Sequence, residues 1–281
     1  MKKKLMVSIA VILLGLMGVR LYFWWSMATL QTFALQVLQA GHPDWRLERS
    51  GANGVKVTSG STVGHVYLNN IQREAGSDRA RARELLEQSA RNLNALFQTP
   101  TLPPLDAVKS RLRPVLVPRD YANQYELAAR PFAGDIVEVL VIDGRSTRYL
   151  RSEDLKAWQT ELAPLLQPAE AALWRDSQAL KLEAKTPADP SKPGKFLALA
   201  TLDGYDAARL AVREMRAALA AELGYPYYVA VPNRDFLVAW SKDYAFAEQF
   251  AQKARRDFGI QSYPLSPSVY RVEPDAVEVV K

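Results

Sequence analysis

The first 25 residues constrain this chain more than any other stretch. Lysines at positions 2–4 are followed by an apolar run, Leu5 to Val19, and after Arg20 an aromatic group ends at Trp24 and Trp25. The stretch from position 5 to the end of this group has 21 residues, close to the roughly 20 that a helix needs to cross the hydrocarbon core. Aromatic residues favour the membrane interface, and lysines favour the cytoplasmic side. The sequence therefore predicts an uncleaved anchor in the inner or plasma membrane, with the rest of the chain outside.

A cleaved signal peptide is the alternative interpretation of the same stretch. A basic start and an apolar run are typical of a signal peptide, and Ser26-Met-Ala28 offers small residues for cleavage. Bulky aromatic residues directly before this site suit a signal peptidase poorly. Arg20 is a cost for an anchor, but it lies close enough to the interface for its guanidinium to extend there. The anchor is favoured, and export after cleavage stays open.

Charge and cysteine content exclude several classes of protein. The chain of 281 residues has 36 Lys and Arg, 30 Asp and Glu and a net charge of +6. Four of the basic residues precede position 26, which leaves 32 basic against 30 acidic residues in the remainder. Such a balance argues against nucleic-acid binding, which needs clustered positive charge. Because the chain has no cysteine, it has neither disulfides nor thiol catalysis.

The remainder alternates short strand patterns with helical ones, which predicts an α+β fold with a largely antiparallel sheet. We expect an anchor with a juxtamembrane helix over residues 1–40, an N-terminal α+β subdomain over 41–184 and a C-terminal subdomain over 185–281. In the last of these, a strand at 196–201 precedes a helix at 207–223, which Asp206 can cap. A hairpin, a second helix and a last strand follow. This β-α-β-β-α-β order is typical of a ferredoxin-like fold.

The segment from Phe196 to Trp240 also resembles a known family. The strand, the sequence Asp203-Gly-Tyr-Asp-Ala-Ala-Arg209, the long helix and the hairpin with Val-Ala-Val-Pro-Asn-Arg-Asp-Phe-Leu-Val-Ala-Trp are similar to the YtpQ-like family of bacterial proteins. Weaker similarity extends over roughly residues 45–280. The resemblance implies an α+β fold and no catalytic residues, because the family has no established activity. Its members are soluble, so the N-terminal segment departs from the family.

Asp203 and Asp206 are the main candidates for a site. Two carboxylates near a helix N-terminus could act as general acid and base, or hold Mg²⁺ or Ca²⁺. The simpler interpretation makes Asp206 a helix cap and Asp203-Gly204 a turn, with Tyr205 packing beside it. The sequence favours the turn.

Several basic and aromatic residues are candidates for binding. Arg209, Arg213 and Arg216 have the spacing of one helix face, where they could contact an acidic partner or lipid headgroups. Arg119 begins a polar segment that could form a recognition loop, and Tyr205 is the aromatic residue between the two aspartates. A solvated helix face and an ordinary loop are the simpler interpretations.

The sequence contains no G-x-S-x-G elbow, H-E-x-x-H helix or Walker A loop. We therefore predict a membrane-anchored, outward-facing domain that binds an envelope or membrane protein as a non-catalytic binding or scaffolding module, without a cofactor. The alternative is a hydrolase or metal-dependent enzyme with its site at Asp203 and Asp206.

Overall fold

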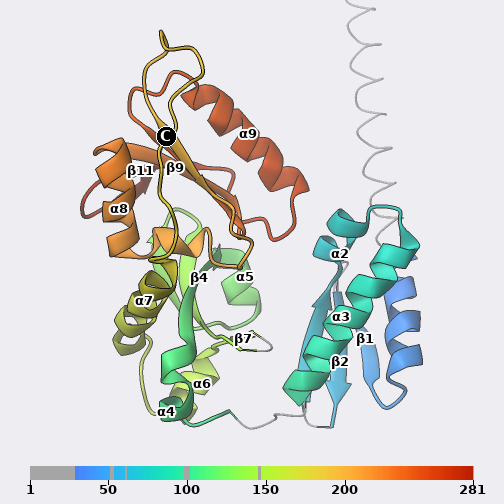
Figure 1. Ribbon diagram of the computed structural model, residues 1–281. Coiled ribbons are helices and arrows are strands. Elements are labelled where there is room, and N and C mark those ends of the chain that lie inside the picture. The colour runs from blue at the N-terminus through green and yellow to red at the C-terminus, as the bar shows by residue number, and fades with distance from the viewer. Residues whose placement is uncertain (1–28, 51–53, 61, 98–101, 145–146, 281) are drawn as a thin grey trace, which may run out of the picture. The chain divides into compact units, whose positions relative to one another are not determined.

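The computed structural model describes residues 29–50, 54–60, 62–97, 102–144 and 147–280 (Figure 1). The predicted anchor, with Leu5, Val19, Trp24 and Trp25, lies outside these residues. Within the described part of the chain, none of the helices combines the length and the apolar character that a membrane crossing requires. The chain divides into two compact units, with unit 1 ending at Pro100 and unit 2 beginning at Thr101. This division differs from the predicted boundaries at 40 and 184.

Unit 1 is a three-stranded antiparallel sheet packed with helices. Its elements are a helix over residues 29–41, β1 (Arg46–Ser50), β2 (Gly54–Ser59), β3 (Thr62–Tyr67), α2 (Leu68–Ala75) and α3 (Arg79–Phe97). The sheet order is β1-β2-β3. The helix over 29–41 contributes Ala34 and Leu38 to the same buried core as Val55 of β2 and Leu86 of α3. It therefore packs into the core of unit 1.

Unit 2 begins with a second antiparallel sheet. Its elements are α4 (Leu105–Val108), η1 (Lys109–Arg111), β4 (Leu112–Pro118), α5 (Arg119–Gln124), β5 (Ala129–Ala133), β6 (Ile136–Ile142), β7 (Arg148–Tyr149), α6 (Ser152–Ala157) and α7 (Ala163–Ser177). The order is β4-β6-β5, and β7 also pairs with β6. All seven residues of β6 are buried, which fits its apolar composition and its central position.

The third sheet contains the C-terminal strands of unit 2. Its elements are β8 (Phe196–Leu199), η2 (Ala208–Leu210), α8 (Arg213–Leu223), β9 (Tyr227–Asn233), β10 (Phe236–Ser241), α9 (Ala247–Ile260), β11 (Val269–Val272) and β12 (Val277–Val279). The described strands of all three sheets pair only in antiparallel fashion. The predicted α+β class with antiparallel sheets is therefore confirmed.

The strand order of this sheet differs from the predicted ferredoxin-like arrangement. The order is β12-β11-β9-β10-β8, so β10 lies between β8 and β9, as in a split β-α-β unit. In a ferredoxin-like sheet the last strand of the motif pairs with the first strand. Here β11 pairs with β9 instead, and the β9–β10 hairpin occupies the centre. The order of elements along the chain was predictable, but the ferredoxin-like label was wrong.

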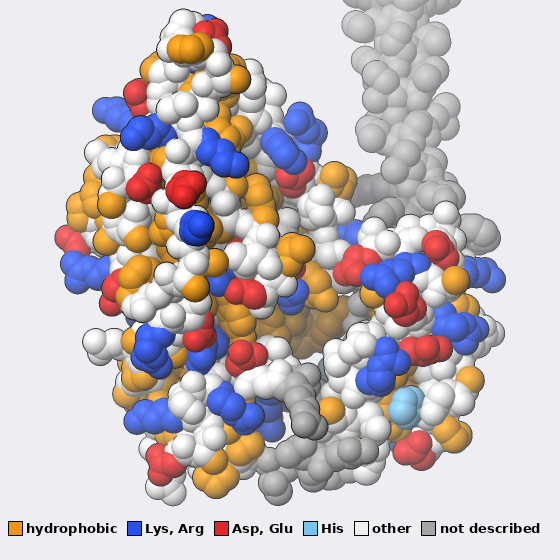
Figure 2. Space-filling view, in the orientation of Figure 1, with side chains coloured by type: hydrophobic (Ala, Val, Ile, Leu, Met, Phe, Trp, Pro, Cys, Tyr) orange, Lys and Arg blue, Asp and Glu red, His pale blue; other side chains and the backbone are white. Residues whose placement is uncertain are grey.

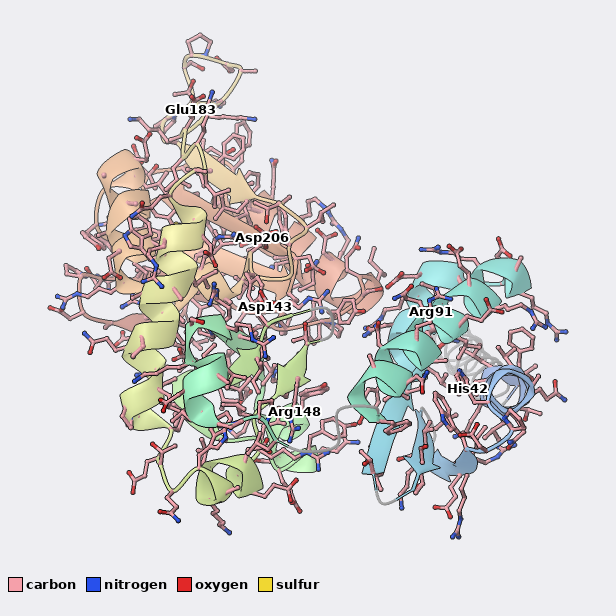
Figure 3. The ribbon with its side chains drawn as sticks, turned by 60° about the horizontal axis from the view of Figure 1, so that its bottom comes forward. His42, Arg91, Asp143, Arg148, Glu183 and Asp206 are labelled. Carbon is pink, nitrogen blue, oxygen red and sulfur yellow. The ribbon has the colours of Figure 1, made fainter. Side chains whose placement is uncertain are left out.

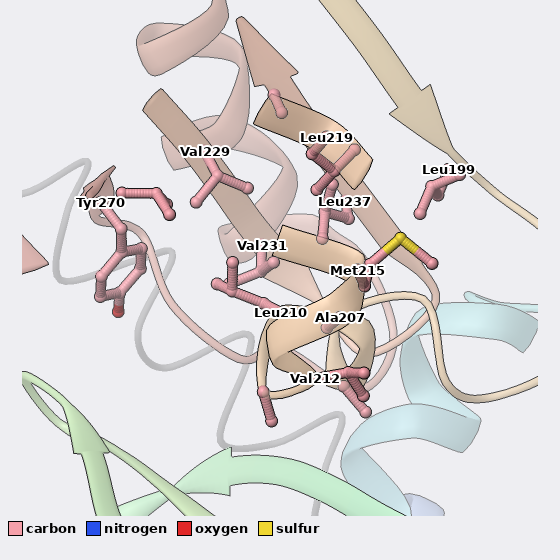
Figure 4. Packing of buried hydrophobic residues seen from close by; sticks show 14 of the residues in the cluster. Leu199, Ala207, Leu210, Val212, Met215, Leu219, Val229, Val231, Leu237 and Tyr270 are labelled. Carbon is pink, nitrogen blue, oxygen red and sulfur yellow. The ribbon is translucent and has the colours of Figure 1, made fainter. Parts of the chain in front are cut away.

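One hydrophobic core joins the two sheets of unit 2. It contains Leu116 of β4, Ile136 of β6 and Leu173 of α7 together with residues from the third sheet and its helices. Figure 4 shows the part of this core around Met215, where side chains of β8, β9, β10 and α8 converge. Because residues on both sides of position 184 share this core, 101–184 and 185–281 form one unit.

Candidate functional site

The turn between β8 and η2 carries the two aspartates. Gly204 has a φ of 88°, a conformation that glycine adopts without strain. Asp203 Oδ1 accepts a hydrogen bond of 2.9 Å from the Tyr205 amide, which closes the turn. The carboxylate of Asp206 accepts hydrogen bonds from the backbone amides of Thr201 and Leu202 at 2.8 and 3.2 Å. Asp206 therefore holds the end of the preceding strand and does not cap the following helix as predicted.

Arg209 joins both aspartates inside the protein. Its side chain is 2% exposed and its Nη1 donates to Asp206 Oδ1 at 3.0 Å and to Asp203 Oδ1 at 3.1 Å, while Nη2 pairs with Asp203 Oδ2. Its Nε donates to Ser177 Oγ of α7 at 3.0 Å. We call these four residues, Asp203, Asp206, Arg209 and Ser177, the ion cluster. Figure 3 shows Asp206 surrounded by helices and strands of unit 2, whereas Glu183 lies on a loop that projects from the same unit.

The two aspartates have pKa values displaced in opposite directions. Burial raises the pKa of Asp206, against the hydrogen bonds from Thr201 and Leu202 and the charge of Arg209. Burial acts the same way on Asp203, but hydrogen bonds from Arg209 and from the Tyr205 amide outweigh it and hold its pKa below the ordinary value. Opposed pKa values in neighbouring carboxyl groups are typical of acid–base pairs. Asp203 and Asp206 can act as an acid–base pair only if a substrate can reach both carboxyl groups.

Access to Asp206 is closed. A carboxylate has about four acceptor positions. The Oδ2 of Asp206 accepts from two amides, and its Oδ1 accepts from Thr201 Oγ1 at 2.9 Å and from Arg209 Nη1. The side chain is fully buried. No acceptor position is left for a substrate proton or a metal ion. Among the residues that the structure describes, no group of three or more His, Cys, Asp or Glu is arranged to hold a metal.

The predicted row of arginines on one helix face does not form. Arg209 lies in η2, before α8 begins, and is buried in the ion cluster. Arg213 is exposed and pairs with Asp275 at 3.1 Å. Arg216 donates to the carbonyl oxygens of Leu210 and Ala211 at 2.9 and 2.8 Å, at the end of η2. Of these three arginines, Arg213 alone is exposed to solvent, as a residue that binds a ligand at the surface needs to be.

The remaining predicted residues lie apart from the ion cluster or beside it. Arg119 begins α5, which replaces the predicted loop, and its Nη2 donates to the Gly134 carbonyl oxygen at 3.0 Å. Tyr205 is half-buried and packs against the valine-rich face of the first sheet of unit 2. Burial, followed by the nearby Asp143, raises the pKa of the Tyr205 hydroxyl. Tyr205 is therefore a packing residue that borders the turn.

A second buried carboxylate was not among the predicted site residues. Glu138 lies on β6 and is fully buried, opposite Arg130 of β5. Arg130 pairs with Glu138 and also with Glu170 of α7, the latter at 2.8 Å. Burial, only partly offset by Arg130, raises the pKa of Glu138 to about 7. Its Oε1 makes no hydrogen bond. A lone acidic residue in an otherwise apolar strand was the sequence signal that could have revealed it.

Comparisons with known proteins identify no relative. No family model matches the chain, and neither a curated protein nor a solved structure matches it. The resemblance to the YtpQ-like family stays a prediction from the residues.

Proposed function

We propose that this chain is a single-pass membrane protein whose outward-facing α+β body binds an envelope or membrane protein and catalyses no reaction. The apolar segment from Leu5 to Trp25 supports the anchor. The saturated hydrogen bonding of Asp206 supports a structural role for the aspartates. In this proposal the ion cluster fixes the backbone of the adjacent turn, which forms part of a binding surface.

The observation that carries the proposal is the conformation of Leu202. This leucine has a φ of 60° and is 78% exposed. The left-handed region costs a residue other than glycine roughly 1–2 kcal/mol. The amide of Leu202 is fixed by Asp206, which is itself fixed by Arg209. Strained residues that the surrounding structure fixes are concentrated at functional sites, and an exposed apolar side chain is suited to contact a partner.

Arg234 and Tyr263 extend this surface. The Arg234 guanidinium lies 3.7 Å from the centre of the Tyr263 ring and pairs with Asp235 at 3.0 Å. The Arg234 carbonyl oxygen accepts from the Ala207 amide, so the β9–β10 hairpin is joined to the turn that carries Leu202. We call Leu202, Arg234 and Tyr263 the Leu202 surface. Arginine and tyrosine are enriched among residues that dominate binding energy in protein interfaces.

Site-specific photocrosslinking in the native cell tests this surface. A photoreactive residue at Leu202 should crosslink to one membrane or envelope protein, whereas one at Tyr225 should not. Tyr225 is a suitable control because it is an exposed large hydrophobic residue, at 40%, that precedes β9, at the opposite end of this strand from Arg234. Equal crosslinking from both positions, or none from Leu202, would refute the binding surface.

The intact mass of C-terminally tagged protein in cell fractions tests the anchor separately. Full-length mass in the membrane fraction is the expected result. A mass that lacks the first 28 residues, in a soluble exported fraction, would replace the anchor with a cleaved signal peptide. The enzymatic alternative predicts instead that Asp203→Asn abolishes a phenotype at unchanged thermal stability.

A further inference from the structure

A group of arginines surrounds the first described turns of unit 1. Arg49, at the end of β1, donates from Nη1 to Gln31 Oε1 and from Nη2 to Thr32 Oγ1, both at 3.0 Å. Arg79 and Arg83 of α3 lie over the Phe33 ring, at 5.7 and 5.6 Å from its centroid. Residues 31–33 point to different sides of their helix, because successive residues are about 100° apart. We call these three arginines the arginine collar.

The positive charge of the collar is not neutralised by neighbouring acids. Figure 2 shows basic and acidic side chains interspersed on unit 1, so the pairing of each acid decides the local charge. Arg81 pairs with both Glu74 and Glu84. Asp78 accepts hydrogen bonds from the first amides of α3. Within the part of the chain that the structure describes, the arginines of the collar form no ion pair with a carboxylate, and all three are exposed.

The collar also lies close to the predicted anchor along the chain. Five residues lie between Trp25 and Gln31, and the six steps from one Cα to the next span at most about 22 Å in a fully extended chain. The Debye length at physiological ionic strength is about 8 Å, so an arginine experiences the potential of a charged membrane surface only within roughly that distance, which is well inside the reach of this segment. A membrane that contains anionic lipid attracts each such arginine.

We propose that Arg49, Arg79 and Arg83 bind the phosphate-bearing headgroups of anionic lipids at the membrane surface where the anchor emerges. This inference rests on the proposed anchor. Phe33 supports the arrangement, because a position over an aromatic ring is favourable for a guanidinium and both arginines of α3 lie over this one ring. Glu74 and Glu84 pair with Arg81, and Glu48 pairs with Arg46 and Lys56, so lipid phosphates would supply the counter-charge of the collar.

Fluorescence quenching by headgroup-labelled lipids, with full-length protein in vesicles, tests the collar. Because the chain has no cysteine, a single introduced cysteine carries the fluorophore at one known position. Ala80→Cys places it beside the collar and Asn92→Cys places it about 18 Å further along α3. Quenching at position 80 should increase when phosphatidylglycerol is added to phosphatidylcholine vesicles and decrease with salt. Quenching at position 92 should change little.

Substitutions identify the residues responsible. Each arginine is expected to change the ratio of docked to undocked protein roughly fivefold, so Arg79→Gln with Arg83→Gln should lower this ratio about 25-fold. Arg91→Gln, at the other end of α3, is the matched control and should have no effect. The circular dichroism spectrum and the melting temperature of each variant confirm that unit 1 is folded. Equal quenching in both kinds of vesicle, or no effect of the double substitution in folded protein, would overturn the collar.

Two further results separate the possible sources of failure. Protein that does not float with either kind of vesicle would refute the anchor and with it the collar. Protein that floats with both but shows no phosphatidylglycerol-dependent quenching would refute the collar alone. Inorganic phosphate should reduce quenching no more than sodium chloride at equal ionic strength. A stronger effect of phosphate would assign the arginines to the free anion and overturn the lipid assignment.

Discussion

Removal of the guanidinium from the ion cluster is the sharpest test of the structural role of Asp206. In Arg209→Met, Asp206 would stay fully buried and would lose the one cationic partner that it has among the described residues, because its other hydrogen bonds come from Thr201 and Leu202. Loss of one partner from a buried ion pair typically costs 3–5 kcal/mol, since the remaining charge is uncompensated. We expect about 4 kcal/mol for this substitution. A helix cap, the role that the sequence suggested, would be worth about 1 kcal/mol.

Urea unfolding followed by tryptophan fluorescence measures this cost. Unit 2 contains Trp158, Trp174 and Trp240, the last of which is buried and reports the core directly. Arg213→Met is the matched control, because both Arg213 and its partner are strongly exposed, and exposed pairs contribute about 0–1 kcal/mol. A cost for the first substitution no greater than that of the control would refute the reasoning.

A second substitution in the same background checks the mechanism. Asp206→Asn together with Arg209→Met removes the uncompensated charge while an amide oxygen can still accept from the amides of residues 201 and 202. The double variant should therefore be more stable than Arg209→Met alone. If the double variant is less stable by the sum of the two single effects, the two side chains are not energetically coupled.

Other substitutions give further predictions. The pKa of Glu138 is about 7 in the folded chain and about 4.5 when the chain is unfolded. Because the folded state holds this proton more tightly, the free energy of unfolding should decrease as the pH rises from about 4.5 to about 7, by at most about 3 kcal/mol. Unfolding midpoints across this range should show this decrease in the wild type and not in Glu138→Gln. Gly194→Ala should lower the melting temperature, since φ is 90° and the new Cβ would lie 2.4 Å from the Tyr244 Cα; an unchanged value would contradict that geometry. Met215→Ala should cost 2–5 kcal/mol in urea unfolding, because Met215 is fully buried in the core of unit 2.

The elements predicted best are those whose pattern is local. The buried strand at 136–142 and the hairpin strands around Arg234-Asp235 were predictable, because an apolar run or an alternating pattern is bounded by turn residues. The strand at 129–133 was missed, since Pro131 argues against a strand and this strand forms one side of its sheet. The helix at 68–75 was missed although Leu68, Ile71 and Ala75 have helical spacing, because its N-cap residue, Tyr67, makes no side-chain hydrogen bond of the capping kind that a sequence motif would indicate.

The ion cluster could not be assembled from the sequence, although three of its members were identified. Asp203, Asp206 and Arg209 lie within seven residues, so their proximity was evident. The predicted helix is divided into η2 and α8, and Arg209, which was predicted on a helix surface, is buried. Its guanidinium contacts Ser177, which is 32 residues earlier and lies on α7. Local periodicity contains no information about such a contact.

The helix over residues 29–41 determines how the predicted anchor would act on the domain. Its Ala34, Val37 and Leu38 are buried in the core of unit 1, so this helix cannot leave the domain without exposing that core. A flexible linker would let a domain move away from the bilayer by a distance that grows with linker length. Here residues 26–28 alone separate the predicted anchor from the described helix. An uncleaved anchor therefore holds the arginines that contact residues 31–33 near the lipid phosphates, at a high local concentration of ligand. Cleavage after Ala28 would release a domain with the same core but without this confinement, and its three arginines alone would bind a membrane weakly.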